Sequence, residues 1–274
     1  MFDSHQGLII SQIRFNSKIT NVKLRNESII GCIIDKIYIL NINTLETIDI
    51  IEINQIIYPI FGLSNNNNKL VIAYPQYNNK GKIQIGKYLI TKGKFKKETL
   101  QINAHESNIV FISMNNDGTL IVTGSEKGQY LRIFDTLNGN LLAELKRGKK
   151  SKINWISFDY NSDIVGYIND VGKIYVYNIC EIKTINKKNF EENNKNDDNN
   201  PKENIKKTHE INKKNIKPFV KFKINENKNI IGFIEPKSVV ILNLQGKLYK
   251  TYYDIKAGKN FVLNEASYIK IDNK

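Results

Sequence analysis

Short apolar runs separated by turn-forming residues repeat along this chain, and that repeat restricts its fold more than any other feature. The runs are rich in Ile, Val, Tyr and Phe and follow one another at intervals of about ten residues, as short strands do in all-β proteins. Four runs make one larger unit, so the longer period is about 40 residues, which is typical of the blades of a β-propeller. No helix-period segment of useful length competes with this pattern. The sequence therefore predicts an all-β fold, a β-propeller of four-stranded blades.

The expected strands fall into units of four. A single strand is expected at residues 8–15, ahead of the first complete unit. Three complete units follow, with strands expected at 19–24, 29–34, 36–42 and 47–53, then at 56–63, 69–74, 82–89 and 95–102, and then at 108–114, 120–124, 130–135 and 141–145. A fourth unit is expected at 153–158, 164–168, 174–179 and 218–224, and most of a fifth at 230–234, 239–244 and 247–255. We therefore expect a single β-propeller domain spanning residues 1–274.

Residues 181–217 interrupt the fourth unit and differ in composition from the rest of the chain. They are dominated by polar residues and contain ten Lys against seven Asp and Glu. Such a segment cannot bury enough apolar area to fold alone, so we expect a low-complexity, disordered loop inserted in a blade. Its basic residues would be attracted to anionic lipid, whereas its sparse apolar residues argue against insertion into a bilayer. The alternative is a low-complexity insert with no membrane role.

The charge balance favours an anionic partner without identifying it. The chain of 274 residues carries 41 Lys and Arg against 27 Asp and Glu, a formal net charge of +14. Nucleic acid, anionic membranes and phosphorylated ligands all fit such a charge. Cys32 and Cys180 form no metal-binding or redox motif, which favours a reducing, cytoplasmic setting. No apolar run reaches the roughly 20 residues that span a bilayer, so any membrane contact is expected to be peripheral.

No group of residues in the sequence predicts catalysis or a cofactor. The stretch from Gly81 to Lys87 has the spacing of a phosphate-binding loop, but neither Ser nor Thr follows it and it alternates as a strand does. Asp159 to Asp163 begins like a calcium-binding loop, yet Ile164 stands where the sharp turn needs Gly, so a turn between strands is the better interpretation. The histidines have no nearby Ser or Cys in a nucleophilic pattern. We therefore expect a binding protein, not an enzyme, with no cofactor and no metal.

A short basic motif, Leu145-Lys146-Arg147-Gly148, stands between the third and fourth units. Side chains alternate along a strand, so Lys146 and Arg147 at a strand end are expected to point to opposite faces of the sheet. One strand end would then supply cations to two neighbouring anion-binding pockets. On the motif alone, a solvated basic loop is the simpler interpretation.

The motif and its surroundings resemble those of the PROPPINs, β-propellers that bind polyphosphoinositides. The hallmark of that family is Phe/Leu-Arg-Arg-Gly at this place in a blade, and here Lys146 replaces the first arginine. The resemblance runs from about residue 8 to the C-terminus and includes Leu70-Val-Ile-Ala-Tyr-Pro75, Ala104-His-Glu-Ser107, Gly118-Thr-Leu-Ile-Val-Thr-Gly-Ser-Glu-Lys-Gly128, Leu131-Arg-Ile-Phe-Asp135 and Leu248-Tyr-Lys-Thr-Tyr-Tyr-Asp254. It implies a WD40-like propeller of the family's seven-bladed type.

By order along the chain, this sequence would supply the last strand of blade two, blades three to six and most of blade seven, or about five blades. The first blade and most of the second would lie outside it. A ring left open exposes sheet edges and apolar blade faces, which favours aggregation. A fragment, a truncated gene model and a divergent protein closed by a partner are the three explanations. We favour truncation, because the strand expected at residues 8–15 begins within a blade.

The resemblance also implies a phosphoinositide site at one rim of the third complete unit. A headgroup with several negative charges needs cations together with hydroxyl or imidazole donors. The family's first site gives this role to His105, Ser107, Thr123, Ser125, Arg132, Lys146 and Arg147. Each has a structural alternative: His105 would orient a turn between blades, the hydroxyls would be ordinary strand-end groups, and Arg132 would pair with Glu126 or Asp135 at the surface. If His105 contacts a phosphate, binding should strengthen as the pH falls from about 7.5 to about 6.

The family's second site is less well matched. It uses the second arginine of the motif, here Arg147, with hydroxyls and a histidine from the next blade. Asn169 and Lys173 stand where hydroxyl side chains are usual, and Tyr175 stands where a histidine is usual. Lys173 would still hold a phosphate as a point charge. We expect one good site and one altered site, with reduced affinity because Lys146 cannot make the planar bidentate contact of an arginine.

These features support three hypotheses about function. The first, implied by the family, is a peripheral membrane protein that binds phosphatidylinositol 3-phosphate, and the 3,5-bisphosphate as a further ligand, and acts as a scaffold in autophagy-related membrane formation or in endosomal and vacuolar traffic. Its partners would be membrane headgroups and autophagy or traffic proteins, and it would be cytoplasmic, recruited to autophagosomal, endosomal or vacuolar membranes. The second is a WD-type protein-interaction scaffold that has lost lipid binding. The third, nucleic-acid binding, rests on charge alone and is not expected, because basic residues interleaved with stacking aromatics are lacking.

Overall fold

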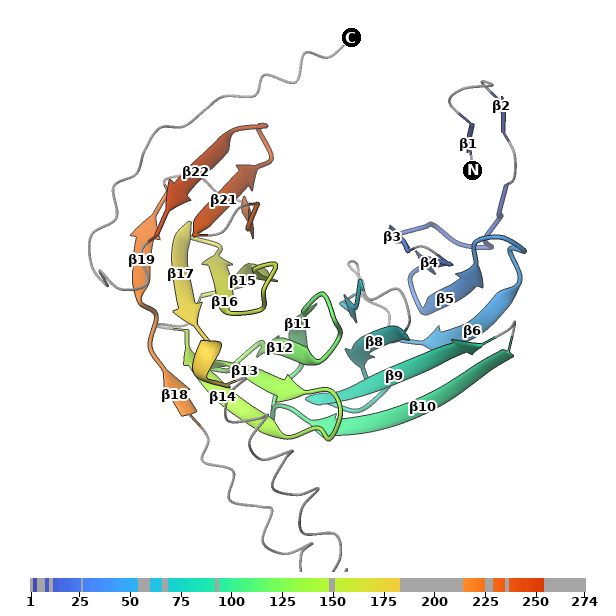
Figure 1. The fold of residues 1–274 in the computed structure, drawn as a ribbon, viewed down its shortest axis with the longest axis horizontal. Coiled ribbons are helices and arrows are strands. Elements are labelled where there is room, and N and C mark those ends of the chain that lie inside the picture. The colour runs from blue at the N-terminus through green and yellow to red at the C-terminus, as the bar shows by residue number, and fades with distance from the viewer. Residues whose placement is uncertain are drawn as a thin grey trace, which may run out of the picture.

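A computed structural model describes residues 2–3, 8–9, 12–25, 27–53, 60–65, 69–91, 94–147, 151–182, 214–224, 229–234 and 237–253 (Figure 1). Among these residues the regular structure is almost wholly β, with one helical turn at residues 180–182. The strands form antiparallel sheets that stand around an arc, each sheet beside the next, as the blades of a propeller do. This is the all-β propeller architecture that the sequence predicts.

Within the described residues the arc consists of five sheets, which we number in chain order. Sheet one contains β3 (Asn21–Leu24), β4 (Ser28–Cys32), β5 (Lys36–Asn41) and β6 (Thr47–Glu52). Sheet two contains β7 (Gly62–Leu63), β8 (Lys69–Pro75), β9 (Lys82–Thr91) and β10 (Lys94–Asn103). Sheet three contains β11 (Ile109–Met114), β12 (Leu120–Ser125), β13 (Tyr130–Asp135) and β14 (Leu141–Lys146). Sheet four contains β15 (Ile153–Phe158), β16 (Ile164–Asn169), β17 (Lys173–Asn178) and β19 (Val220–Lys223), and sheet five contains β20 (Asn229–Gly232), β21 (Ser238–Asn243) and β22 (Leu248–Tyr252).

Apolar side chains fill the space between successive sheets. In β12, Val122 packs toward sheet four and Ile121 toward sheet two, because neighbouring side chains of a strand point to opposite faces. In the described part of the chain this arrangement gives four apolar cores, one between each pair of successive sheets. Strands such as β4 and β16 are buried at every residue, which explains why their apolar runs are nearly continuous.

The strand expected at residues 8–15 is wrong over its second half. Within this range β2 (Leu8–Ile9) pairs with β1 (Phe2–Asp3) in a separate two-stranded sheet, and residues 10–11 lie outside the described residues. Residues 12–15 form no strand. The ring of Phe15 instead packs against Tyr38 of β5, with 5.0 Å between ring centroids. An alternating apolar pattern is therefore satisfied here by side-chain packing without a ladder of backbone hydrogen bonds.

The other differences concern short strands near gaps in the description. In sheet two, β7 covers Gly62–Leu63, and residues 54–59, where the start of the strand expected at 56–63 falls, lie outside the described residues. An additional strand, β18 (Lys214–Ile216), pairs in parallel with β14 at Ala143–Leu145. It is the end of the interruption predicted at residues 181–217, of which residues 183–213 lie outside the described residues.

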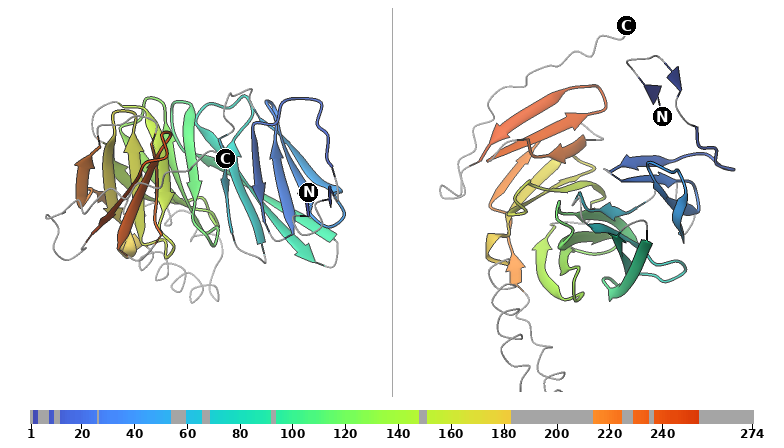
Figure 2. Two further views of the ribbon diagram at one scale, coloured as in Figure 1. Left: turned by 90° about the horizontal axis from the view of Figure 1, so that it is seen from above. Right: turned by 45° about the vertical axis from the view of Figure 1, so that its right-hand side comes forward.

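The arc of sheets is open on one side, between sheet one and sheet five (Figures 1 and 2). Seen from above, the strands stand side by side, as in a disc viewed at its edge (Figure 2). The inner strands β3, β7, β11 and β15 line a cavity of about 520 Å³ near the axis. The outer faces of the two end sheets carry exposed apolar side chains, among them Leu24 on β3, which is 68% exposed, and Leu242 on β21.

Candidate functional site

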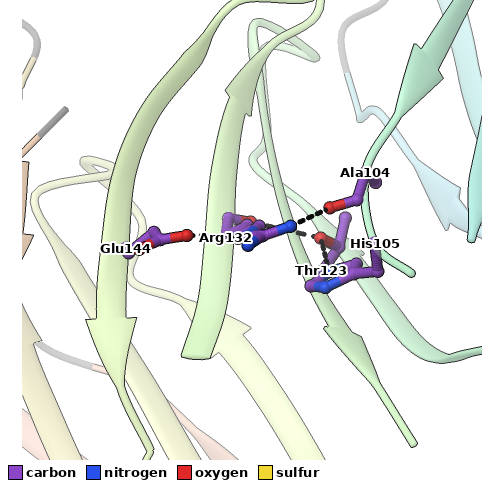
Figure 3. A network of polar contacts seen from close by, with 5 residues as sticks. All are labelled: Ala104, His105, Thr123, Arg132 and Glu144. Atoms are coloured by element: carbon purple, nitrogen blue, oxygen red, sulfur yellow. Dashed lines mark hydrogen bonds and ion pairs between the residues drawn. The ribbon is translucent and has the colours of Figure 1, made fainter. Parts of the chain in front are cut away.

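Three residues lie in a row across the outer strands of sheet three. Thr123 of β12 is paired with Arg132 of β13, and Arg132 is paired with Glu144 of β14, so the three side chains share one face of the sheet. That face packs against sheet two, whose last strand leads into Ala104 and His105. Figure 3 shows these five residues together, although they come from three strands and the preceding loop.

Hydrogen bonds join this row to the loop before β11 (Figure 3). The Thr123 hydroxyl donates to the carbonyl of Arg132 at 3.3 Å, which leaves His105 Nε2 to donate to the Thr123 oxygen at 2.8 Å. Arg132 Nε donates to Glu144 Oε1 at 2.8 Å, and Arg132 Nη1 donates to the carbonyl of Ala104 at 2.7 Å. His105 thus orients the turn between two sheets, the structural role that was the alternative to contacting a phosphate. Arg132 pairs with Glu144, a partner that the sequence did not suggest.

Gly81 fixes the loop that carries His105. The backbone N–H groups of Ala104 and His105 both donate to the Gly81 carbonyl, at 3.0 and 2.9 Å. Gly81 has a φ of 72°, and a Cβ atom there would lie 1.7 Å from the carbonyl oxygen of His105. Only glycine fits this position. Gly81 therefore has a structural role. The residues from Lys82 to Lys87, which complete the spacing of a phosphate-binding loop, belong to strand β9.

The environment of His105 keeps its imidazole neutral. The pKa of His105 is lowered to about 4, chiefly by burial and also by the positive charge of Arg132, whereas Glu144 acts in the opposite direction. A protonated ring is therefore disfavoured near neutral pH. The expectation that binding strengthens between pH 7.5 and 6 requires a ring that becomes protonated in this range, which the lowered pKa of His105 disfavours.

The two cations at the end of β14 have different environments. Arg147 is only 3% exposed; its Nη1 donates to the carbonyl of Ser125 at 3.0 Å and its Nη2 donates to the carbonyl of Ser151. Ser151 precedes β15 and lies beside Tyr167, so Arg147 is turned toward sheet four. Lys146 is exposed, and alternation along β14 places its side chain on the face of Glu144. This agrees with the predicted divergence of the two side chains. The Arg147 guanidinium, however, already donates to two backbone carbonyls of the protein.

The predicted hydroxyl groups of the first site are buried. Thr123 and Ser125 are 0% and 1% exposed, and Ser107 is buried as well. The Ser107 hydroxyl oxygen accepts the backbone N–H of Lys127 at 3.1 Å, which ties the loop before β11 to the turn after β12. In this arrangement these hydroxyls shape the rim of the sheet and offer little surface to a ligand.

The residues predicted for the second site lie in sheet four. Asn169 is buried, its Oδ1 accepts the N–H of Lys173 at 2.8 Å, and its Nδ2 donates to the Ser151 hydroxyl oxygen at 3.0 Å. Tyr175 stacks on Tyr167 with 5.5 Å between ring centroids. Asn169 and Tyr175 are therefore used to build the turn and the core, while the Lys173 side chain is exposed.

Two further lysines join Lys173, although the sequence patterns did not single them out. β19 pairs Lys223 with Lys173 and Lys221 with Tyr175, and the apolar side chains of β19 pack toward sheet five. Lys221 and Lys223 therefore lie on the face of Lys173, and both are exposed. In the described part of the chain none of these three lysines forms an ion pair with a carboxylate. Like charges directly opposite on a sheet repel, so this basic strip (Lys173, Lys221 and Lys223) favours an anion.

The arrangement as a whole is suited to binding anions. Exposed lysines stand on sheets three and four, and the side chain of Arg132 is 30% exposed. Among the described residues no group of three His, Cys, Asp or Glu side chains is placed to hold a metal ion. No helix of the described residues is long and apolar enough to cross a membrane.

Comparison with known proteins identifies the family. A family model described as PROPPIN matches residues 1–195, which is more than half of the chain. The chain belongs to the PROPPIN family. This PROPPIN is 27% identical over 180 residues to Autophagy-related protein 18e of Arabidopsis thaliana, covering 65% of this chain and 46% of that protein. It is 27% identical over 159 residues to human WD repeat domain phosphoinositide-interacting protein 1, covering 58% of this chain and 34% of that protein. The chain thus spans between a third and a half of the length of these curated relatives.

Solved structures confirm the propeller fold. Hsv2 of Kluyveromyces lactis with its complete loop 6CD superposes with a TM-score of 0.75 at 18% identity, covering 98% of this chain and 79% of that one. A complex of KlAtg21 with the coiled coil of AgAtg16 gives a TM-score of 0.71 at 19% identity, covering 98% of this chain and 76% of that one. Membership in this family of propeller proteins also agrees with the prediction that the chain is not an enzyme.

Proposed function

We propose that this PROPPIN binds phosphoinositide headgroups and thereby attaches peripherally to membranes. The observation that carries the proposal is the set of exposed cations on two neighbouring sheets, with Lys146 on sheet three and the basic strip on sheet four. The name of the human relative, which describes a phosphoinositide-interacting protein, supports the same ligand class. Phosphatidylinositol 3-phosphate is the proposed ligand, and the 3,5-bisphosphate is the further one.

The accessible residues suit a phosphorylated membrane surface better than a single enclosed ligand. Lysine holds a phosphate as a flexible point charge, and each basic residue near an anionic bilayer contributes about 1 kcal/mol. One such contact is weak. Several contacts on one membrane add through effective concentration, so Lys146 and the basic strip together can bind although neither forms a closed pocket. In this proposal Arg132, Lys146 and Lys173 contact headgroups, while His105, Ser107, Thr123, Ser125 and Arg147 hold the rim in shape.

The wider role follows from the relatives' names. Several are autophagy-related proteins, and one solved neighbour is bound to the coiled coil of AgAtg16. We place this chain as a cytoplasmic scaffold that is recruited to phosphoinositide-rich membranes and there presents autophagy or traffic proteins. The membranes would be autophagosomal, endosomal or vacuolar. Nucleic acid is not a proposed partner.

Vesicle co-sedimentation tests this function. The chain is mixed with phosphatidylcholine vesicles that contain either phosphatidylinositol 3-phosphate or plain phosphatidylinositol. We expect preferential binding to the first, and weaker binding for Lys146→Thr. Lys69→Thr, at an exposed lysine of sheet two, is the matched control and should bind as the unmodified chain does. Lys146→Thr is preferred to a change at Arg147, because Arg147 is buried and its loss would disturb the fold.

The burial of Arg147, Thr123 and Ser125 also favours a second candidate function, a WD-type protein scaffold that has lost lipid binding. Such a scaffold would bind both kinds of vesicle equally and would be unaffected by Lys146→Thr. The same co-sedimentation experiment therefore separates the two candidates, and equal binding would reject the lipid proposal.

A further inference from the structure

Glu144 places a buried negative charge in the middle of a site otherwise suited to anions. Its side chain is 5% exposed, and its Oε1 accepts Arg132 Nε at 2.8 Å across directly paired positions of β13 and β14. A buried carboxylate is costly unless a cation and hydrogen bonds compensate it. Arg132 supplies both. The pair is therefore nearly neutral, and Lys146 is left as the excess positive charge on this face of sheet three.

Arg132 is fixed in place but not enclosed. A guanidinium carries five N–H donors in a planar fork. Glu144 binds the Nε side of that fork, and the carbonyl of Ala104 binds Nη1 at 2.7 Å. The side chain of Arg132 nevertheless keeps 30% of its surface exposed, and these two hydrogen bonds use only two of its five N–H donors. Figure 3 shows Arg132 between these two partners, held at both ends.

We propose that Glu144 is a positioning residue for headgroup binding: it holds the Arg132 guanidinium with its open N–H donors available to a phosphate, and its charge limits how strongly that phosphate is attracted. This inference rests on the proposed function, since it needs a headgroup at Arg132. Held in one geometry, Arg132 loses little side-chain freedom when a phosphate binds. The neighbouring carboxylate at the same time repels the phosphate, so Glu144 influences affinity in two opposite ways.

Two substitutions separate these effects. Glu144→Gln keeps an oxygen that accepts from Arg132 Nε but removes the negative charge. Glu144→Ala removes the oxygen and the charge together, so Arg132 loses its anchor. If Glu144 positions Arg132, the glutamine variant binds vesicles containing phosphatidylinositol 3-phosphate about threefold more tightly than the unmodified chain, because the repulsion between the Glu144 carboxylate and the phosphate is removed. The alanine variant binds about tenfold more weakly than the glutamine variant, which is the loss of one charge-assisted hydrogen bond.

Two controls distinguish positioning from a general effect on charge or folding. Glu126→Gln removes an exposed carboxylate at the turn after β12 and is expected to change binding little. The second control is Arg132→Gln, in which Glu144→Gln should no longer tighten binding, because without Arg132 no phosphate is held close enough to Glu144 to be repelled by it. Salt titration adds a readout that a structural role would not change, since Glu144→Gln should make binding more salt-dependent.

Three results would overturn the inference. The first is binding of both Glu144 variants with the affinity of the unmodified chain. The second is an equal loss in both variants accompanied by an equal fall in melting temperature, which is the sign of a structural role. The third is tighter binding by Glu144→Gln that persists in the Arg132→Gln background. Failure of the proposed function is a different outcome, in which the unmodified chain itself does not distinguish phosphatidylinositol 3-phosphate from phosphatidylinositol.

Discussion

At the scale of single residues, His105 links the stability of the fold to pH. Its pKa is lowered to about 4 by burial and by the charge of Arg132, against an ordinary value of 6.5. The folded state therefore resists protonation while the unfolded state accepts it, so the stability from the neutral ring is complete above pH 6.5 and is lost as the pH falls toward 4. We expect thermal unfolding between pH 7 and about 4 to show this loss. His105→Gln, which keeps an N–H donor near Thr123 but does not titrate, should lose less stability over the same range.

Carboxylates elsewhere in the chain also titrate in the lower part of this range, so the difference between the two proteins is the quantity to compare. Parallel stability profiles for the unmodified chain and His105→Gln would show that His105 is not held neutral. The same pKa predicts that vesicle binding hardly changes between pH 7.5 and 6, because His105 has no charge to gain there.

The adjacent cations Lys146 and Arg147 should differ in what they do for stability. Arg147→Ala leaves the carbonyls of Ser125 and Ser151 without their buried donor, which we expect to lower the free energy of unfolding by about 2 kcal/mol. Lys146→Ala removes an exposed side chain and should change that free energy by less than about 0.5 kcal/mol. Denaturant titration of the two variants checks this. A larger loss for Lys146→Ala than for Arg147→Ala would contradict the assignment of roles.

The sequence could predict which residues gather at this site, but it could not predict which of them a ligand can reach. Strand alternation is a local property, so the divergence of Lys146 and Arg147 could be read from their order. The burial of Thr123 depends on how sheets two and three pack, which no local pattern contains. The pairing of Arg132 with Glu144 depends on the register of β13 and β14, which is shifted by an irregularity between Ile133 and Phe134. The role of Gly81 was missed for the same reason, because the clash that excludes a side chain comes from His105, far along the chain.

At the scale of the strand, β19 supplies a basic face to sheet four. We expect the double variant Lys221→Gln, Lys223→Gln to bind phosphoinositide vesicles about thirtyfold more weakly, since each lysine contributes about 1 kcal/mol near an anionic surface. Removing these charges also relieves the repulsion between Lys223 and Lys173, so thermal stability should be unchanged or slightly higher. Vesicle co-sedimentation and a melting curve measure the two effects.

The matched control for this prediction changes two lysines far from β19. Lys36→Gln with Lys69→Gln removes the same charge from sheets one and two. If this control weakens binding as much as the β19 variant does, net charge alone attracts the chain to vesicles and β19 has no special part.

The strands show where pattern-based prediction succeeds and where it fails. Long alternating or fully apolar runs such as β5, β12 and β16 lie where the sequence predicts them, because burial between two sheets selects such runs strongly. β18 could not be predicted, since its three residues pair with β14, about 70 residues earlier, only after sheets three and four have come together. Apolar alternation also predicts strands that do not form. Phe15 lies in such a run, and it packs on Tyr38 without joining a sheet.

At the scale of the whole molecule, the open arc has two apolar end faces. Val22 and Leu24 are exposed on the outer face of sheet one, and Ile230 and Leu242 are exposed on the outer face of sheet five. Apolar sheet faces of this kind promote association, so we expect the isolated chain to self-associate as its concentration rises. The double variant Val22→Thr, Leu24→Thr keeps strand propensity but removes apolar surface, and it should shift sedimentation velocity profiles toward the monomer. Tyr160→Thr, at an isolated side chain that is 84% exposed, is the control and should leave the profile unchanged. A monomer at all concentrations, or an equal shift in both variants, would show that the end faces do not drive association.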